Sequence, residues 1–222
     1  VRLIIEMAQA LLTFHDGSAT SFIATANRSA DKLVHLILQN FPGFRDATVD
    51  PWKGRWLAFY KRAQILVADL WAALGTIGEN QSKDDDRDNT CSSLRRTSCV
   101  GKFGIDLCNF VDMNKITTFA DYRVPQLLRN LGVLRYSTSL AGQVDRGEEI
   151  DVFSMDELYI RASTVQAVDR LVDKVSDRIV GKPNISMNIN SVKMDWYLWN
   201  IGEKLDRECK LEKHHRVRTI FY

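Results

Sequence analysis

The chain has 222 residues, of which 45% are hydrophobic, enough to build a packed core in one domain or two small ones. Its 30 Lys and Arg residues nearly balance its 28 Asp and Glu residues, so the formal net charge is only +2. This balance excludes a protein that tracks nucleic acid through a broad basic surface, although it permits a local pocket for one phosphate.

The cysteines and the start of the chain indicate the cellular setting. None of the four cysteines forms a CxxC pair or lies near a histidine at ligand spacing, which favours reduced thiols over disulfides or a zinc site. The apolar start is too short for a signal peptide or a membrane span. We therefore expect a cytoplasmic protein with no metal and no membrane segment. Because the chain lacks an initiating Met, we also expect a fragment of a longer protein.

Helical periodicity dominates the first part of the chain. Leu3 to Phe14 predicts a short amphipathic helix, and Ser29 is a typical N-cap for a helix over Ala30 to Asn40. Pro42 ends that helix, because proline cannot continue its hydrogen-bond ladder. Residues 54–74 predict one long helix.

The helical pattern resumes after an interruption. Residues 82–98 are polar and acidic, and we expect them to form a mobile insertion loop. Further helices are predicted over 120–130, 155–180 and 191–206, followed by a short extended tail over 216–222. No strand–helix alternation, internal repeat or glycine-rich phosphate loop occurs, so the predicted fold class is all-α.

The predicted helix over 54–74 lacks an ordinary solvated face. One side carries an apolar stripe that includes Phe59, and the opposite side is small and apolar apart from Lys61 and Gln64. Two interpretations are equally supported. Either both polar side chains face a cavity or an interface, or Lys61 simply extends along apolar surface to reach water.

A carboxylate lies among aromatic rings between Phe119 and Gln126. Thr117 or Thr118 is expected to cap the following helix, which places Asp121 in its first turn, where the helix dipole stabilises an ionised acid. Residue type alone favours an ordinary helix-start acid here. The neighbouring rings shift the balance somewhat toward a binding site.

A second carboxylate, Asp195, also lies near a predicted helix start. The rings of Trp196, Tyr197 and Trp199 follow it, and three large rings in four positions cannot all face the core. By itself this segment favours an aromatic cluster with Asp195 as a cap. Aromatic faces hold flat heterocycles, however, and a fixed carboxylate stabilises positive charge that develops beside it. The two segments together therefore suit an enzyme that cleaves a base from a sugar.

The remaining polar groups have simpler interpretations. Glu157 and Arg161 are spaced for an ordinary salt bridge within a helix. His214 and His215 stand among charged residues and are expected in an exposed tail. No Ser-His-Asp order, metal cluster or Cys–His pair is evident.

Several stretches, in one order, resemble the queuosine salvage protein family, the queuosine 5′-phosphate N-glycosylases. The resemblance covers the chain from about Ser29 to the C-terminus. The matching stretches are Phe41–Asp46, Phe59–Trp71, Thr118–Gln126, Glu157–Ala162 and Asp195–Trp199.

The resemblance implies one helical domain over residues 1–222, related to helix-hairpin-helix DNA glycosylases. It implies hydrolysis of the N-glycosidic bond of queuosine 5′-monophosphate, which releases queuine for salvage into tRNA modification. It also implies no metal or organic cofactor. We expect a monomer that acts on a small nucleotide, without stable nucleic-acid binding.

The expected site follows from this chemistry. Breaking a base–ribose bond places positive charge on the sugar, which an ionised carboxylate favours. Asp121 is the first candidate for that role and Asp195 the second, although analogy with DNA glycosylases favours the reverse. The other acid would hold the ammonium group of queuine. The expected substrate contacts are Phe119 and Trp196 around the flat base, Tyr122 beside it, Asn200 at the diol, and Lys61 or Arg161 at the phosphate.

Two features depart from the family pattern. The family has an N-terminal segment that contributes a histidine and part of the aromatic wall; it is not found here, and His15 does not fit its position. Asn200 also stands where the family has an acid. The first alternative is therefore a non-catalytic or truncated helical protein that binds a nucleotide or a partner. The second is a glycosylase acting on a polymer, which requires a basic groove.

Overall fold

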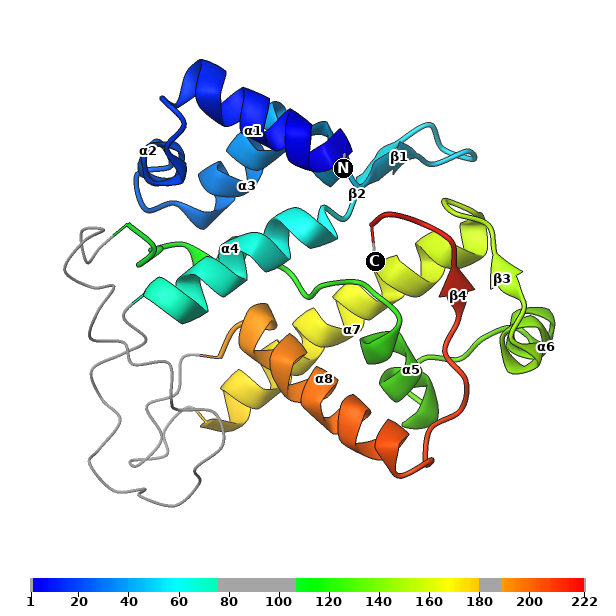
Figure 1. Ribbon diagram of the computed structural model, residues 1–222. Helices are drawn as coiled ribbons and strands as arrows, with labels where there is room; N and C mark the ends of the chain where they lie inside the picture. Colours follow the sequence, from blue (N-terminus) through cyan, green and yellow to red (C-terminus); the bar gives the residue numbers. More distant parts are fainter. Residues whose placement is uncertain (1, 76–106, 180–188, 222) are drawn as a thin grey trace. The chain divides into compact units, whose positions relative to one another are not determined.

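The computed structural model describes residues 2–75, 107–179 and 189–221, so the predicted insertion loop, 82–98, lies outside the described residues. Helices dominate, and the prediction of a mainly α fold is confirmed (Figure 1). The helices are α1 Arg2–Phe14, α2 Ala19–Ala24, α3 Ala30–Asn40, α4 Lys61–Leu74, α5 Arg123–Asn130, α6 Thr138–Arg146, α7 Met155–Ile179 and α8 Ser191–Arg207, with short 3-10 turns η1 Pro42–Phe44 and η2 Met113–Lys115.

The strands of the described residues are short and form two separate two-stranded sheets. β1 Ala47–Val49 lies antiparallel to β2 Trp56–Ala58. β3 Glu149–Ile150 lies parallel to β4 Arg216–Val217, which begins the predicted extended tail. The sequence did not predict the other three strands, because two or three residues carry too little alternation to be recognised.

The chain divides into two compact units, each described by itself. The described parts of Val1–Pro42 and Ile65–Met113 form the first unit. Those of Gly43–Gln64 and Asn114–Tyr222 form the second, which carries every side chain of the candidate site.

In the first unit, α3 begins where the sequence predicts. The Ser29 hydroxyl oxygen accepts a hydrogen bond from the Lys32 backbone N–H at 3.1 Å. The Asp112 carboxylate accepts from the Ser29 hydroxyl at 2.8 Å and from the Ala30 N–H at 2.6 Å. Leu33 and Ile37 of α3 are fully buried. A side-chain cap and an apolar face therefore define this helix together.

In the second unit, the prediction of one helix over 54–74 is wrong in its first turns. Gly54 has a φ of +61° and Tyr60 a φ of +48°, both left-handed, and β2 lies between them. The Asp46 carbonyl oxygen accepts from the N–H groups of Phe59 and Tyr60, at 3.0 and 3.2 Å. Because these backbone hydrogen bonds replace helical ones, α4 begins only at Lys61, and Phe59 lies outside the helix.

The helix predicted over 120–130 begins later, as α5 at Arg123. Tyr122 occupies its cap position without a side-chain cap bond, so the predicted capping by Thr117 or Thr118 is wrong. Pro125 is the third helical residue, where no ladder bond is lost. Gly132, with a φ of +71°, follows the end of the helix, a position that glycine adopts readily.

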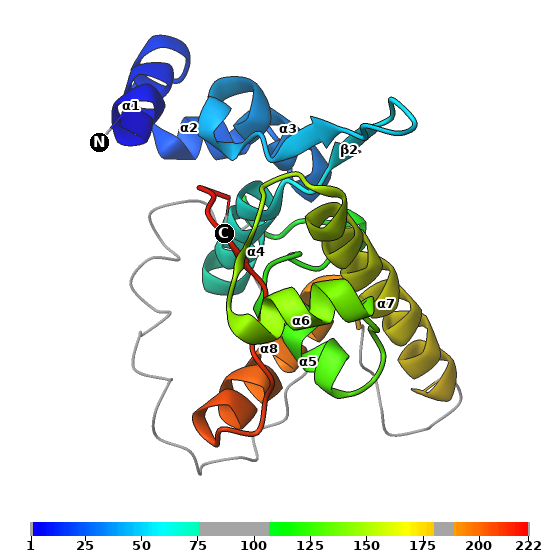
Figure 2. The same cartoon turned by 90° about the vertical axis from the view of Figure 1, so that its right-hand side faces the viewer.

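The predictions for α7 and α8 are confirmed. The Asn190 side-chain oxygen caps α8 by accepting from the Lys193 N–H at 2.9 Å. Figures 1 and 2 show α5, α7 and α8 side by side. Their shared core holds the N-terminal turns of α5 and α8 in place. Its buried members are Val124, Leu127, Leu128, Val168, Met194 and Leu198.

Candidate active site

A buried cluster of charged side chains lies within the second unit. Lys61 is the first residue of α4, Asp121 lies in the loop before α5, and Asp195 lies in the second turn of α8. Lys61 Nζ is 3.6 Å from Asp121 Oδ2, and these two side chains are only 11% and 12% exposed. The structure therefore brings together three residues that the sequence predicted separately.

Asp195 is held by the loop that carries Asp121. Its Oδ1 accepts from the Thr118 hydroxyl at 2.5 Å and from the Phe119 N–H at 2.9 Å. Burial raises the pKa of the Asp195 carboxyl to about 7, against the opposing effect of these two hydrogen bonds. Asp121 adds to the rise and Lys61 opposes it. The prediction that Asp195 caps its helix is wrong, because Asn190 does so.

Asp121 is oriented by the start of α5. Its Oδ1 accepts from the Arg123 N–H at 2.9 Å, while Oδ2 faces Lys61. Asp121 thus precedes the first helical turn rather than lying within it. The Arg123 guanidinium is turned elsewhere, toward Glu203 at 2.7 Å and Asp206 at 3.0 Å.

Lys61 and Gln64 are both buried, which contradicts one of the two interpretations of this helix face. Burial lowers the pKa of the Lys61 ammonium, an effect that Asp121 opposes and Arg161 reinforces. The interpretation that Lys61 reaches water is therefore wrong. Gln64 contacts the neighbouring loop, where its Oε1 accepts from the Thr117 N–H at 2.8 Å.

Arg161 belongs to a fully buried network that the sequence did not reveal. Its Nη1 and Nη2 donate to both carboxylate oxygens of Asp46, and Nη1 lies 3.3 Å from Glu157 Oε1. All three side chains are 0% exposed. The predicted salt bridge between Glu157 and Arg161 is confirmed, and Asp46, a distant residue, joins it. The sequence singles out Asp46 only as the end of Phe41–Asp46, a stretch that resembles the family.

The aromatic residues near Asp195 point in different directions, as predicted. Phe119 is buried and Trp196 half-buried, whereas Tyr197 is 63% and Trp199 41% exposed. Asn200 is exposed, and its amide donates to the Trp196 carbonyl oxygen at 2.8 Å. Their predicted contacts with a substrate remain predictions.

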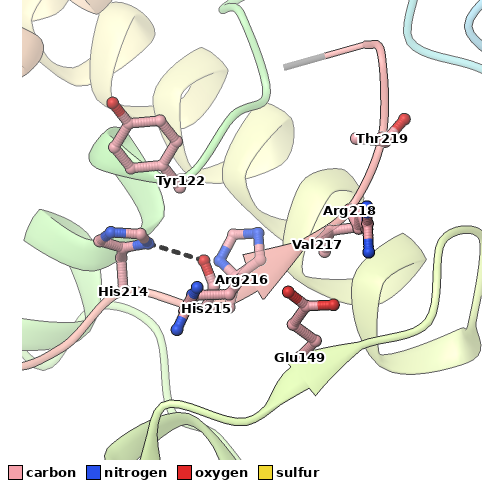
Figure 3. Close-up of a pocket in the computed structure, with 8 residues that line it drawn as sticks. All are labelled: Tyr122, Glu149, His214, His215, Arg216, Val217, Arg218 and Thr219. Atoms are coloured by element: carbon pink, nitrogen blue, oxygen red, sulfur yellow. Dashed lines mark hydrogen bonds between the residues drawn. The ribbon is translucent and has the colours of Figure 1, made fainter.

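A hollow of about 400 Å³ lies beside Tyr122 in the second unit (Figure 3). The other lining residues are Glu149, His214, His215, Arg216, Val217, Arg218 and Thr219. The rings of Tyr122 and His214 pack with their centroids 4.6 Å apart. Asp121, Lys61 and Asp195 do not line this hollow, and Tyr122 links it to Asp121 along the chain.

His215 corrects the prediction of an exposed tail. Its side chain is buried, and burial lowers the pKa of its imidazole to about 4, with His214 and Arg161 adding to the effect. The ring is therefore neutral at physiological pH. Nothing in the local sequence signals this burial, which depends on how the segment before β4 packs.

No helix in 2–75, 107–179 or 189–221 is long and apolar enough to cross a membrane. Within the same ranges, no three His, Cys, Asp or Glu side chains gather in a way that could hold a metal ion.

The chain is similar to a known protein family and to several named proteins. A family model described as queuosine salvage protein matches residues 1–87 and 99–222. Three relatives named queuosine 5′-phosphate N-glycosylase/hydrolase align with the whole chain. The one from Dictyostelium discoideum is 38% identical over 57% of its own length. Those from Sphaerobacter thermophilus and Mus musculus are 35% and 34% identical, each over 56% of its length.

The chain thus spans just over half the length of these relatives. The family match covers most of the chain, including both acidic segments of the buried cluster. This chain belongs to the queuosine salvage protein family.

Proposed function

We propose that the protein hydrolyses the N-glycosidic bond of queuosine 5′-monophosphate and releases queuine for salvage into tRNA modification. The observation that carries this proposal is the pair of buried acids, Asp121 and Asp195, gathered with Lys61 in one cluster. The names of the relatives, queuosine 5′-phosphate N-glycosylase/hydrolase, support the choice of substrate.

The two acids suit different tasks, because their surroundings differ. Asp121 faces an ammonium group and a backbone N–H, and we assign it the negative charge that stabilises the sugar as the bond breaks. Burial raises the pKa of Asp195 to about 7, which suits it to exchange a proton near neutral pH. We assign it the proton that the departing base requires.

The reaction balances with these two groups and one water molecule. The bond between C1′ and the base nitrogen breaks, and its electron pair leaves with the base. The Asp195 proton neutralises that base. The oxygen of water then bonds to C1′, and a proton of that water restores Asp195. The products are queuine and ribose 5-phosphate.

The substrate contacts extend from this cluster. We propose that Phe119 and Trp196 hold the flat base and that Asn200 binds the diol. Tyr122, which follows Asp121 and lines the hollow, would contact the substrate between the reacting bond and the hollow. A volume of about 400 Å³ falls within the range of small-molecule sites. Lys61 is the better candidate for the phosphate, because the Arg161 guanidinium is enclosed and engaged with Asp46 and Glu157.

We propose one queuosine salvage domain over residues 1–222, related to helix-hairpin-helix DNA glycosylases and acting as a cytoplasmic monomer. The net charge of +2 supports a nucleotide substrate rather than stable binding to tRNA.

Incubating the purified chain with queuosine 5′-monophosphate and detecting free queuine by mass spectrometry tests this function. Release of queuine and ribose 5-phosphate is the expected result. Queuosine without its phosphate and intact modified tRNA serve as comparison substrates. Nucleotide binding by calorimetry without queuine release would overturn the proposal in favour of the non-catalytic alternative. Release from tRNA, with salt-sensitive binding, would favour a polymer substrate.

A further inference from the structure

We propose that Arg161 is a positioning residue, which holds Lys61 and Asp121 at their working separation through two separate connections. This inference rests on the proposed function and adds a residue that acts on the reacting groups without touching the substrate. The two connections start from one guanidinium and end at the two members of the Lys61–Asp121 pair.

The guanidinium itself is fixed from several sides. It binds both carboxylate oxygens of Asp46, contacts Glu157, and lies with Cζ 4.0 Å from the centroid of the Phe59 ring. The side chains of Arg161, Asp46 and Glu157 are each 0% exposed. Glu157 is braced in turn, because its Oε2 accepts from the Phe153 N–H at 2.6 Å. A planar fork held in this way has little freedom to move.

The first connection runs through Asp46 to Lys61. Asp46 Oδ2, which Arg161 binds, also lies 3.3 Å from the Lys61 backbone N–H. The Asp46 carbonyl oxygen accepts from Phe59 and Tyr60, directly before that lysine. Tyr60 adopts a left-handed φ of +48°, a conformation that costs free energy and persists only where its surroundings impose it. Asp46 thus sets the point from which the Lys61 side chain extends.

The second connection runs from the same guanidinium to Asp121. Arg161 Nε donates to the Ala120 carbonyl oxygen at 3.1 Å. Ala120 directly precedes Asp121, whose Oδ2 is 3.6 Å from Lys61 Nζ. The loop that carries the acid and the helix start that carries the lysine therefore share one anchor. Loss of that anchor would allow both to shift.

The chemistry explains why only arginine suits this position. The two connections use Nε for one and the Nη pair for the other, in a fixed planar arrangement. Lysine would keep the charge but would offer a single ammonium group, which cannot reproduce this geometry. Arg161→Lys therefore removes positioning while retaining the positive charge.

The test compares Arg161→Lys with Arg129→Lys in this chain. Arg129 is a matched control: its side chain is only 11% exposed, it pairs with Asp145 and Glu212, and it packs on the Tyr136 ring. We expect Arg161→Lys to lower kcat by about 10-fold to 100-fold, since small displacements of reacting groups have effects of this size. We expect KM to change less than kcat, because Arg161 does not touch the substrate and affects binding only through a shift of Lys61, the proposed phosphate contact. Arg129→Lys should lower the melting temperature without this loss of kcat.

The outcomes separate this inference from the proposed function. Equal kcat in the two variants, or a rise in KM alone for Arg161→Lys, would overturn the positioning role. If the wild-type chain releases no queuine, the proposed function fails, and crystal structures of the two variants decide the inference. An unchanged Lys61–Asp121 separation in Arg161→Lys would then overturn it. If Arg161→Lys does not fold, Asp46→Asn, which preserves side-chain volume, must show the same loss of kcat for the inference to stand.

Discussion

Asp195 is a buried acid that binds its proton more tightly in the folded chain than in the unfolded one. Burial raises its pKa to about 7 from an ordinary value of 3.8, although two hydrogen bonds to its Oδ1 favour the charged form. The fold therefore tolerates an unfavourable charge at this place. Such a carboxyl is well suited to exchange a proton near neutral pH.

We predict that Asp195→Asn stabilises the fold at alkaline pH. Between pH 3.8 and about 7, the folded chain holds a proton on Asp195 that the unfolded chain has lost. The free energy of unfolding therefore falls as the pH rises through this window, by up to about 4 kcal/mol. Asparagine keeps an oxygen acceptor for Thr118 and Phe119 and carries no charge. Urea unfolding at about pH 5 and at about pH 8 measures the change in the free energy of unfolding.

Asp169→Asn provides the control, because Asp169 is an exposed acid that also accepts a hydroxyl hydrogen bond, from Ser191 at 2.8 Å. Its unfolding curves should follow those of the wild type at both pH values. The account of Asp195 is contradicted if Asp195→Asn also leaves the pH dependence unchanged.

At the scale of elements, α5 and α8 approach each other closely at Gly202. A Cβ atom there would lie 2.9 Å from Arg123 Cδ and 3.0 Å from Cγ. The Arg123 side chain has little room to yield, because Glu203 and Asp206 hold its guanidinium. Close packing of these helices thus requires glycine inside α8, where its low helix propensity is a disadvantage.

We predict that Gly202→Ala destabilises the protein by about 1 kcal/mol, since overpacking outweighs the gain in helix propensity. Gly142→Ala in α6 is the matched control. There the new Cβ would meet only Arg146 Nη1, at 3.2 Å, the end of an exposed side chain that can move. That variant should gain about 0.5–1 kcal/mol. Thermal unfolding of both proteins gives the comparison, and a stabilised Gly202→Ala would contradict the packing described.

The C-terminal segment around β4 depends on a neutral histidine. We predict that acidification weakens its attachment, because the His215 pKa is about 4 when folded and 6.5 ordinarily. The unfolded chain binds the additional proton between these values, so stability is lost as the pH falls from 6.5 to about 4, by up to about 3 kcal/mol. His215→Gln should remove this dependence. Hydrogen exchange of the β4 amides at about pH 5 and about pH 7 reports it.

His35→Gln controls for the histidine substitution, because the His35 side chain is 63% exposed. It should leave the exchange of β4 as in the wild type. Equal acid sensitivity of β4 in the wild type and in His215→Gln would show that another group is responsible.

Local signals in the sequence were sufficient for some elements and insufficient for others. The cap at Ser29 and the apolar period of α3, α7 and α8 are contained within each helix, so their bounds could be predicted. A strand, β2, replaced the predicted helical turn, because the carbonyl oxygen of Asp46, outside that segment, accepts from the N–H groups of Phe59 and Tyr60 directly after the strand. Contacts of this kind leave no periodic pattern.

The same distinction applies to the candidate site. Asp121 and Asp195 were recognisable as acids among aromatic rings, and Lys61 as a cation on an apolar helix. Asp46 was not, because its partner Arg161 is 115 residues away in the chain. The burial of His215 likewise depends on tertiary packing. Residue type and spacing therefore identify candidate reacting groups, whereas their supporting contacts become visible only in three dimensions.

At the scale of the whole molecule, Asp195 and His215, two buried groups whose pKa changes affect stability below neutral pH, act in opposite directions. Protonation of Asp195 favours the folded chain as the pH falls, whereas protonation of His215 opposes it. The wild-type stability should therefore vary little between about pH 4 and pH 6.5, where the two effects offset each other. A flat profile in the wild type, with opposite slopes in Asp195→Asn and His215→Gln, is the expected pattern in denaturant unfolding.

The negative charge of Asp121 is the central requirement of the proposed chemistry. Its most direct test is the rate of queuine release from queuosine 5′-monophosphate by Asp121→Asn, relative to the wild type and to the exposed-acid control Asp145→Asn. We predict a loss of roughly 100-fold to 1,000-fold in Asp121→Asn, the size expected for removing one electrostatic contact to the transition state. The control should retain its rate, and all three proteins should melt cooperatively. Undiminished queuine release by a folded Asp121→Asn variant would contradict the account.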